Sequence, residues 1–342
     1  MSSAIETTTG QAPLRLGFQT HLHGEEPARE LYPAVVDLFV AAEELGFDTG
    51  WVAQHHFSRD EGRLPSPLPF LAAVAASTSR IRLGTTVVTL SLEDPVRVAE
   101  DASVVDALSN GRLELGIGSG NPQPGQFAAF GRDVGRRHEI FADHAARLRS
   151  ALSGDEVAPG LRLEPPALGL ADRLWEAPLT RERVEAAARR GSGVLLGIGP
   201  GRSVQLDLAH AYRDAAEQVG VHPRIAVVHS AFFGPSAESV VGELSPGLRS
   251  GSLDYYVEAG WVGRDAPPGD LLTAMNVHHG TPADVAASLR DQPVLDFATD
   301  LVLAVQSRST SIARAVRALE TIATEVRPAL DARRATLPPR RR

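Results

Sequence analysis

The feature that most constrains the fold of this chain is a repeated alternation of short apolar runs with longer helical patterns. Eight short apolar runs fit buried strands, and apolar residues at helical spacing follow each of them. The predicted strands cover residues 14–20, 49–53, 81–90, 112–117, 172–176, 193–198, 224–233 and 299–306. The predicted helices cover residues 28–46, 69–77, 95–108, 136–152, 180–190, 203–219, 236–248 and 309–326, with one more opening at residue 281.

Strict alternation of strand and helix predicts a parallel sheet with helices packed on it. Eight repeats in 342 residues fit a single (β/α)8 TIM barrel with loop insertions better than an open sheet. An open dinucleotide-binding sheet usually carries a glycine fingerprint after its first strand, whereas residues 19–23 are Gln-Thr-His-Leu-His. We therefore predict one barrel over residues 13–330, between a disordered N-terminal tail at residues 1–12 and a basic C-terminal tail at residues 331–342.

Missing residue types and the charge balance limit the chemistry and the partners. The chain has no cysteine, which excludes thiol nucleophiles and cysteine-ligated metal centres. All 34 of its Lys and Arg residues are arginine, so a Schiff base, a P-loop and a carbamylated-lysine metal bridge are excluded too. A net charge of −8 argues against a nucleic-acid partner. No signal peptide and no apolar run of about 18 residues is present, so we expect a cytoplasmic protein with no membrane partner.

Polar residues cluster where the first two predicted strands end, which is where barrels of this kind place their active sites. His21 and His23 follow the first strand, and His55 and His56 follow the second. A single histidine at a strand end is more often a loop residue bonded to the backbone than a catalyst. Adjacent residues on a strand point to opposite faces, so we expect His55 and His56 to have different surroundings. Histidines from two neighbouring strand ends nevertheless predict a site.

One chemistry that fits these histidines is that of a metal-dependent, amidohydrolase-type barrel. His21 and His23 would share one strand face and bind a metal, with His229 and Asp300 as further ligands. The lysine that bridges two metals in many such enzymes is absent, and Asp300 stands at the start of its strand, which is the wrong end for the site. The metal hydrolase is therefore the weaker alternative, and we expect no metal.

The other chemistry is that of a flavin site, because several segments resemble one known family. Residues 51–57, WVAQHHF, are similar to the "EHHF" segment of the bacterial-luciferase-like, flavin-dependent monooxygenases. Residues 108–118, LSNGRLELGIG, resemble the "LSxGRxxLGxG" pattern of the same family. Further similar segments, in the family's order, are residues 83–90, 92–101, 127–131 and 280–286. Their common order makes the resemblance specific.

The resemblance implies a two-component monooxygenase. Reduced FMN would react with O2 to give a flavin hydroperoxide that oxygenates a small organic substrate. The chain shows no pyridine-nucleotide fingerprint, so a separate flavin reductase would supply the reduced FMN. The family also implies a homodimer. On the same fold, a deazaflavin that transfers hydride is the alternative, favoured by the arginine-, alanine- and glycine-rich composition typical of high-GC genomes. A barrel that binds a cofactor without catalysis is a third possibility, against which His55 argues.

The resemblance assigns roles to individual strand-end residues. His55 would be the general acid or base near the flavin, because imidazole titrates close to neutral pH. The candidates for substrate binding are His21, His23 and His56. The family's cis peptide bond, which bulges against the flavin ring, falls between Thr86 and Val87.

The remaining cofactor contacts implied by the resemblance lie after the fourth and fifth strands. Gly118 and Ser119 match the fourth-strand end beside the flavin. Leu179, Thr180 and Arg181 open the helix after the fifth strand, whose free N–H groups would bind the flavin phosphate. The sequence departs from the family at two of these positions, since luciferases have an arginine in place of Ser119 and a carboxylate in place of Leu179.

Overall fold

Eight parallel strands close into a barrel in the computed structural model, which describes residues 13–335 except 168, 198, 200, 249–256, 259, 261 and 309. The barrel strands are β1 (Arg15–Thr20), β2 (Thr49–Val52), β3 (Arg82–Thr85), β5 (Leu113–Gly118), β6 (Leu174–Glu176), β7 (Gly193–Leu196), β8 (Ile225–Phe233) and β10 (Asp300–Ala304). The sheet closes because β10 pairs in parallel with both β1 and β8. The predicted TIM barrel is therefore confirmed, while the predicted tail at residues 1–12 lies outside the described residues.

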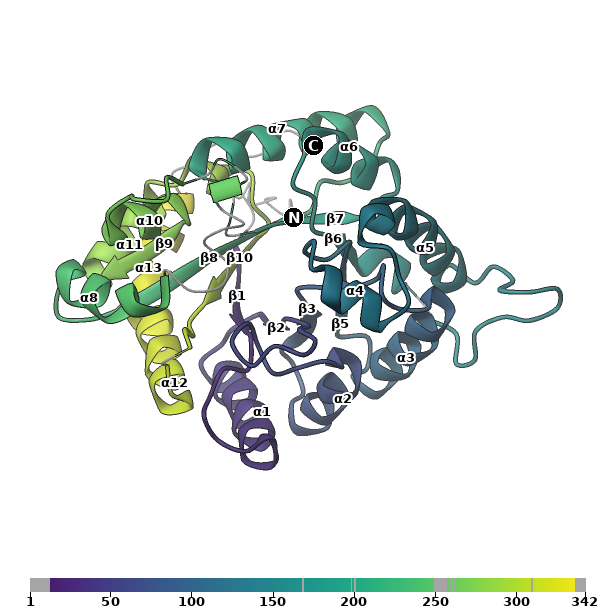
Figure 1. Ribbon diagram of the computed structural model, residues 1–342, viewed down its shortest axis with the longest axis horizontal. Helices are drawn as coiled ribbons and strands as arrows, with labels where there is room; N and C mark the ends of the chain where they lie inside the picture. The colour runs from purple at the N-terminus through teal and green to yellow at the C-terminus, as the bar shows by residue number, and fades with distance from the viewer. Residues whose placement is uncertain are drawn as a thin grey trace, which may run out of the picture.

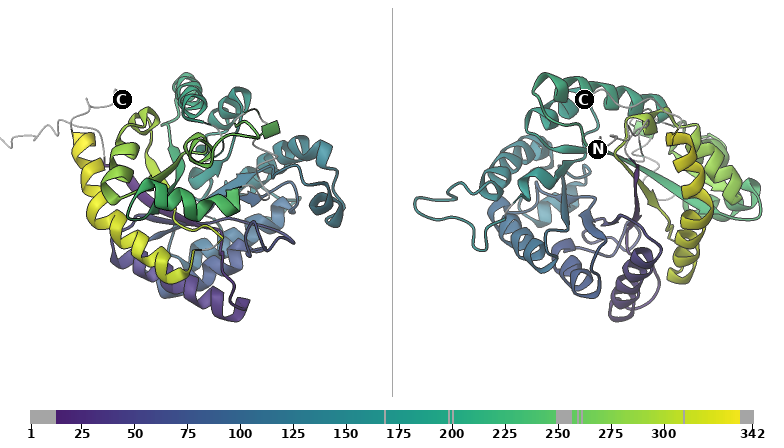
Figure 2. Two further views of the ribbon diagram at one scale, coloured as in Figure 1. Left: turned by 60° about the vertical axis from the view of Figure 1, so that its left-hand side comes forward. Right: turned by 180° about the vertical axis from the view of Figure 1, so that it is seen from behind.

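Helices surround the strands in chain order, as the colour gradient of Figure 1 and the rear view in Figure 2 show. The α-helices are α1 (Ala28–Glu44), α2 (Pro67–Ser77), α3 (Pro95–Leu108), α4 (Pro124–Ala129), α5 (Arg137–Leu152), α6 (Arg181–Arg189), α7 (Arg202–Gln218), α8 (Ala237–Leu248), α10 (Pro268–Ala274), α11 (Pro282–Arg290), α12 (Ile312–Thr321) and α13 (Arg327–Ala335). Shorter turns are η1 (Val134–Arg136), η2 (Ala171–Arg173), η3 (Pro293–Asp296) and the π-helical η4 (Ile322–Val326). None of the described helices has the length and apolar character needed to cross a membrane.

The sequence specifies several helix starts directly. Asp94 accepts hydrogen bonds from the backbone N–H groups of Val96 and Arg97, and Pro95 occupies the first position of α3. Thr281 and Asp284 form a capping box at the start of α11. These caps satisfy N–H groups that have no partner inside the helix.

Two strand predictions need correction. The single strand predicted over residues 81–90 is interrupted after β3 by a cis peptide bond between Thr86 and Val87, and continues as β4 (Val88–Thr89), which pairs with β5. An additional strand, β9 (Val277–Gly280), was not predicted. It forms because β8 is longer than its barrel neighbours, and its last residues, Ser230 to Phe233, pair with β9.

The predicted basic tail begins later than residue 331. Helix α13 continues to Ala335 because it packs on the barrel. Leu330 is buried in the main core, and Arg334 donates hydrogen bonds to the carbonyls of Leu295 and Ala298. The first residues of the predicted tail thus belong to the folded domain, and residues 336–342 lie outside the described part.

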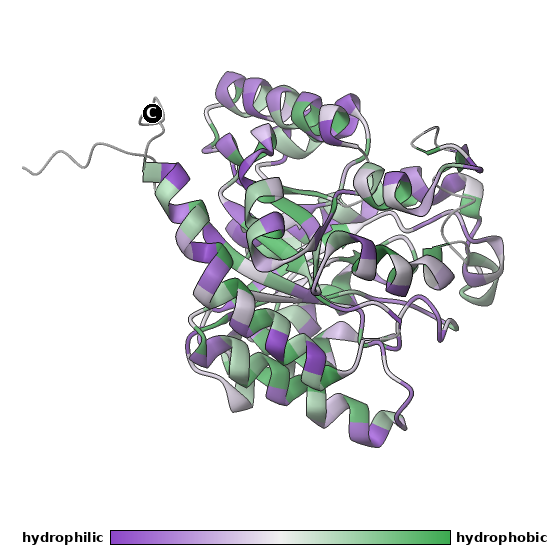
Figure 3. Ribbon diagram, turned by 90° about the vertical axis from the view of Figure 1, so that its left-hand side faces the viewer, coloured by the Kyte–Doolittle hydropathy of each residue, from purple (hydrophilic) through white to green (hydrophobic). Residues whose placement is uncertain are grey.

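The inside of the barrel is closed at the amino ends of the strands. Trp51 and Trp175 fill its middle together with aliphatic residues from β7, β8 and β10. Below them, the buried carboxylate of Glu114 lies 3.0 Å from Arg15 Nη1 and accepts a 2.6 Å hydrogen bond from Trp175 Nε1. Arg15 also pairs with Asp300 at 2.8 Å. In Figure 3 the central strands are mainly hydrophobic and the outer helices alternate in colour. Among the described residues, these side chains fill the interior at the amino ends of the strands.

Candidate active site

Small residues line the inside of the barrel at the carboxyl ends of the strands. The inward-facing positions above the tryptophan layer are Ala53, Gly118, Ala177 and Ala304, by the alternation of side chains along each strand. Val87, which follows the cis peptide bond, packs over this layer: a Cβ atom on Gly118 would lie 2.6 Å from Val87 Cγ2. The resemblance-based prediction of a cis bond at Thr86–Val87 is therefore confirmed. Together these residues form a layer of small side chains against which Val87 packs closely.

Four buried polar atoms at this end of the barrel have no hydrogen-bond partner among the described residues. One is His56 Nε2 after β2, and the other three are Gln19 Oε1 on β1, Thr86 Oγ1 after β3 and Gln306 Nε2 after β10. These strands are close neighbours, in the order β10, β1, β2 and β3. A buried polar atom without a partner costs about 1–3 kcal/mol, so such a group usually has a partner in the functional state. An acceptor, a hydroxyl and a donor around a small-residue layer suit a planar ligand with a polar edge, such as a flavin.

His21 and His55 form the centre of a hydrogen-bonded chain above this layer. His21 Nδ1 lies 2.9 Å from His55 Nε2, and His21 Nε2 lies 3.3 Å from Gln19 Nε2. On the other side, His55 Nδ1 lies 3.6 Å from Glu61 Oε2. Burial is the main cause that lowers the pKa of His21 well below its usual value. The structure thus brings together the two histidines that the sequence singled out from different strand ends.

Glu61 and Gln123 belong to this chain but were not predicted. Gln123 Nε2 donates to both carboxylate oxygens of Glu61, at 2.8 and 3.0 Å. The hydrogen bond from His55 is the main cause that lowers the pKa of Glu61. Sequence spacing gave no signal, because both residues lie in irregular loops that contact the histidines only through the tertiary fold.

His23 and His56 lie on opposite sides of this chain. The ring of His23 stacks on that of His21 with centroids 5.5 Å apart, and burial lowers the pKa of His23 to about 4. His56 instead packs edge-on against Phe130 at 4.8 Å, and its carbonyl accepts a hydrogen bond from Gln126 Nε2. The expectation that His55 and His56 have different surroundings is confirmed. Their roles in substrate binding stay a prediction.

A hollow of about 610 Å³ extends outward from His56. It lies between the loop after β2 and helix α4, and its lining includes Phe57, Gln123 and Gln126. Phe57 is 77% exposed and has a φ of 56°, an unusual combination for a large apolar residue. The hollow is a candidate entrance for an organic substrate.

The N-terminus of α6 is a candidate anion site. Thr180 caps this helix without a side-chain hydrogen bond to it, so the first N–H groups stay available. Arg181 is exposed and pairs with Glu185 on its own helix at 3.1 Å. Burial, followed by the charges of Arg183 and Arg137, lowers the pKa of His138 to about 4, so both arginines act on the first turn of α5.

Arg137 is the further candidate that the sequence did not reveal. Its Nε is buried without a partner, and it stands at the first position of α5. The carbonyl of Ser119 accepts a hydrogen bond from Ser91 Oγ at 2.7 Å, and Leu179 is exposed. The contacts predicted for Ser119, Leu179, Thr180 and Arg181 stay predictions.

Comparison with known proteins identifies the family. Residues 15–300 match the family described as luciferase-like monooxygenase. The chain belongs to the luciferase-like monooxygenases. The family implies an oxidoreductase, in agreement with the resemblance noted in the sequence. The match covers the barrel almost completely, from β1 to the start of β10.

Individual relatives of this chain carry names that give different activities. The 4-hydroxyprotoasukamycin monooxygenase of Streptomyces nodosus is 33% identical over 210 residues, 60% of this chain and 53% of that protein. An F420-dependent glucose-6-phosphate dehydrogenase of Kineococcus radiotolerans is 38% identical over 148 residues, 42% of this chain and 40% of that protein. The matches to the first three curated relatives span only 30%, 59% and 53% of their lengths.

A solved structure agrees with the fold. The oxygenating component of 3,6-diketocamphane monooxygenase from Pseudomonas putida, in complex with FMN, superposes with a TM-score of 0.74. It is 19% identical in sequence, and the match covers 96% of this chain and 100% of that one. At this identity the likeness concerns the barrel fold.

The residues of the alternative metal site do not come together in the structure. Asp300 pairs with Arg15 at the closed end of the barrel. His229 faces the helices, where its Nε2 lies 2.8 Å from Gln205 Oε1 and its Nδ1 lies 2.9 Å from His278 Nε2. Across the described residues, no group of three His, Asp or Glu side chains could hold a metal ion. The geometry therefore does not support the hydrolase alternative.

The His229–His278 pair predicts acid-sensitive stability. Burial lowers the pKa of His278 to about 4 and that of His229 well below 6.5. Because the unfolded chain binds these protons more tightly, the free energy of unfolding falls as pH decreases from about 6.5 to 4, by roughly 3 kcal/mol for His278. We expect His278→Gln to flatten the pH dependence of urea unfolding over that interval. An unchanged pH dependence would show that His278 is not a buried neutral residue.

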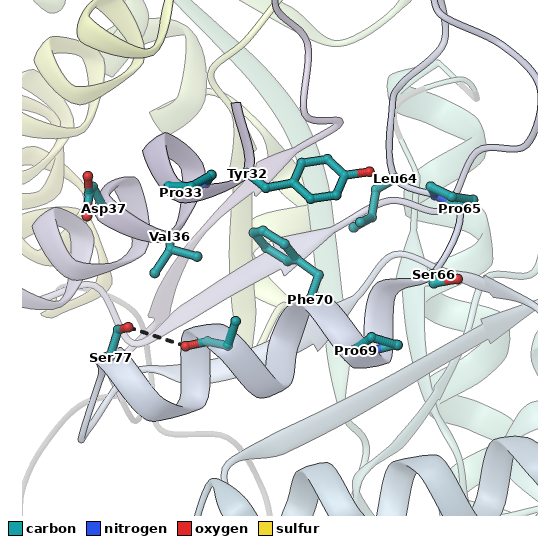
Figure 4. A pocket seen from close by; sticks show the side chains of 11 residues that line it. Tyr32, Pro33, Val36, Asp37, Leu64, Pro65, Ser66, Pro69, Phe70 and Ser77 are labelled. Atoms are coloured by element: carbon teal, nitrogen blue, oxygen red, sulfur yellow. Dashed lines mark hydrogen bonds between the residues drawn. The ribbon is translucent and has the colours of Figure 1, made fainter. Parts of the chain in front are cut away.

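A second hollow, of about 550 Å³, lies on the outside of the barrel between α1 and α2 (Figure 4). Its lining is mostly apolar and includes Val36, Leu64 and Phe70. Tyr32 extends toward Leu64 in Figure 4, and its hydroxyl donates a 2.7 Å hydrogen bond to the carbonyl of Arg63. No member of the histidine chain lines this groove, so it is separate from the candidate active site.

Proposed function

We propose that this protein is an FMN-dependent monooxygenase that oxygenates a small organic substrate. The observation that carries the proposal is the open end of the barrel, where unpartnered polar atoms surround a small-residue layer beneath the histidine chain. Reduced FMN would supply two electrons and two protons, so that one oxygen atom of O2 enters the substrate and the other leaves as water. The protein's part is to hold the reactants, exclude water and move protons.

The residues around the opening divide these tasks. Val87 and Gly118 offer an apolar surface for the ring, while Gln19, Thr86 and Gln306 offer polar atoms for its edge. The N-terminus of α6 would bind the phosphate through its free N–H groups, with Arg137 beside it. His55 would donate or accept a proton at the reacting atoms. His56 and the adjoining hollow would receive the substrate.

Two further parts of the proposal concern partners. Since the sequence contains no pyridine-nucleotide fingerprint, a separate flavin reductase would deliver the reduced FMN. We also propose that the protein acts as a homodimer, as the family resemblance implies. Light scattering of the purified protein and a reductase-coupled oxygen-uptake assay address these two statements separately.

A deazaflavin-dependent hydride transfer is the second candidate. The 38% identity to an F420-dependent dehydrogenase supports it. In favour of FMN, the match to a monooxygenase extends over 210 residues, whereas the match to the F420-dependent dehydrogenase extends over 148 residues. The QHHF segment at residues 54–57 also resembles the monooxygenases more closely.

The cofactor is tested by binding. The protein is titrated anaerobically with reduced FMN and, separately, with reduced F420, and the complexes are then mixed with O2. We expect tight binding of reduced FMN, and O2 uptake that yields an oxygenated product when substrate is present. Tight binding of F420 with no affinity for FMN would move the protein to the hydride-transfer class.

A further inference from the structure

We propose that Glu61 is a positioning residue whose carboxylate accepts the Nδ1–H of His55 and thereby joins Glu61, His55 and His21 into one proton relay. The inference deepens the proposed function, because the relay would serve the reaction at the open end of the barrel. Its geometry comes from the protein alone and does not depend on which cofactor binds.

Glu61 fixes the tautomer of each ring in turn. An ionised carboxylate can only accept hydrogen bonds, so His55 Nδ1, 3.6 Å from Glu61 Oε2, carries a proton. In the neutral ring His55 Nε2 is then an acceptor, and His21 Nδ1 donates to it across 2.9 Å. His21 Nε2 is left as an acceptor for the Gln19 amide N–H at 3.3 Å. Both hydrogen bonds of His21, and the longer 3.6 Å contact between His55 and Glu61, therefore point toward Glu61.

Glu61 is itself held in place from two sides. Gln123 donates to both of its carboxylate oxygens. Gly62, the next residue, lies directly on the histidines: a Cβ atom there would come within 2.5 Å of His55 Cδ2 and 2.6 Å of the His21 carbonyl oxygen. A larger residue would push the loop off the imidazole. The close packing of this loop is therefore what keeps the carboxylate on His55.

The hydrogen-bonded pair of His21 and His55 can take up a proton at His21 and place the positive charge on His55. A proton that binds His21 Nε2 replaces the hydrogen bond from Gln19. The Nδ1–H bond of His21 then breaks as a new N–H bond forms at His55 Nε2. One proton enters and none leaves, and the positive charge lies on His55, beside the Glu61 carboxylate. Without that carboxylate, the charge would have no stabilising partner.

The charged groups around His55 bear on this transfer of a proton from His21 to His55. Burial lowers the pKa of His21, His23 and His56, and the charge of His55 lowers each of these pKa values further. Glu61 is the carboxylate in direct contact with it. Arg308 interacts electrostatically with both Glu61 and His23, and it pairs with Asp60 at 3.6 Å.

The experiment compares Glu61→Ala, Glu61→Gln and the matched control Asp60→Asn, which alters a neighbouring carboxylate of the same loop. The first readout is the nitrogen NMR spectrum of the imidazole rings in the full chain without cofactor. We expect His55 and His21 to be Nδ1–H tautomers in the wild type and in Asp60→Asn, and His55 to lose this preference in Glu61→Ala. Glu61→Gln keeps the tautomer, since an amide oxygen still accepts the Nδ1–H.

The second readout is the pH profile of the reoxidation of bound, reduced FMN by O2. The acidic limb should move to lower pH in Glu61→Gln, and the rate should drop about 10-fold or more in Glu61→Ala, less than the 10²–10⁴-fold expected for losing a catalytic acid or base. Wild-type His55 as the Nε2–H tautomer, or a Glu61→Ala spectrum like that of the wild type, would overturn the proposal. A protein with these tautomers but no affinity for FMN would overturn only the proposed function.

Discussion

Replacing His55 with alanine should slow the reoxidation of bound, reduced FMN by O2 by about 10²–10⁴-fold, the usual contribution of a general acid or base. The side chain of His55 is 18% exposed, and its ring nitrogens contact His21 and Glu61. The next residue, His56, lines the hollow between the loop after β2 and α4, so His55 lies close to the edge of that hollow. We therefore expect the affinity for reduced FMN and the unfolding midpoint to change little. Stopped-flow absorbance, equilibrium titration and thermal melting provide the three measurements.

His56→Ala is the matched control for this experiment. His56 faces Phe130 and lines the hollow, so its loss should affect substrate affinity more than the rate. A His55→Ala protein that melts markedly lower but reacts at the wild-type rate would show that His55 supports the fold instead of the chemistry.

Replacing Arg137 with glutamine should weaken FMN binding by about 10- to 150-fold, since a hydrogen bond to a charged group contributes roughly 1.5–3 kcal/mol. Arg137 Nε is buried without a partner, and in the proposed function it lies beside the phosphate. Riboflavin, which lacks the phosphate, should lose much less affinity. Fluorescence titration with both ligands measures the difference.

Arg181→Gln is the control for the phosphate site. Arg181 pairs with Glu185 along its own helix, so the substitution should change FMN affinity only a few-fold. Thr180→Ala tests the cap of the same helix and should also affect FMN more than riboflavin. Equal losses for FMN and riboflavin in Arg137→Gln would place the phosphate elsewhere.

The barrel itself follows from local sequence patterns. The eight barrel strands appear as apolar runs, and helix starts such as Asp94-Pro95 carry their own caps. The spacing of apolar residues repeats within a few positions, so it can be recognised without knowing what each element packs against. The pattern failed at residues 81–90, where a uniform apolar run conceals a break in the strand after Thr85.

The candidate site was predicted only in part. His21 and His55 stand at strand ends, and the parallel order of β1 and β2 brings those ends together. Asp300 was correctly placed at the closed end of the barrel, because a strand start lies opposite to the strand ends in a parallel barrel. The residues at the cis bond, Thr86 and Val87, came from family resemblance, since nothing in the local pattern marks them.

By itself, the sequence determined the strand order, the open end of the barrel and the histidines that stand there. Only the tertiary structure decided that Glu61 contacts His55, that Gln123 holds Glu61, and that Arg137 Nε is buried without a partner. The physical reason is the range of the forces involved. The periodicity of apolar residues is a local property of each helix or strand. A hydrogen bond between two loops instead depends on where the complete barrel places those loops.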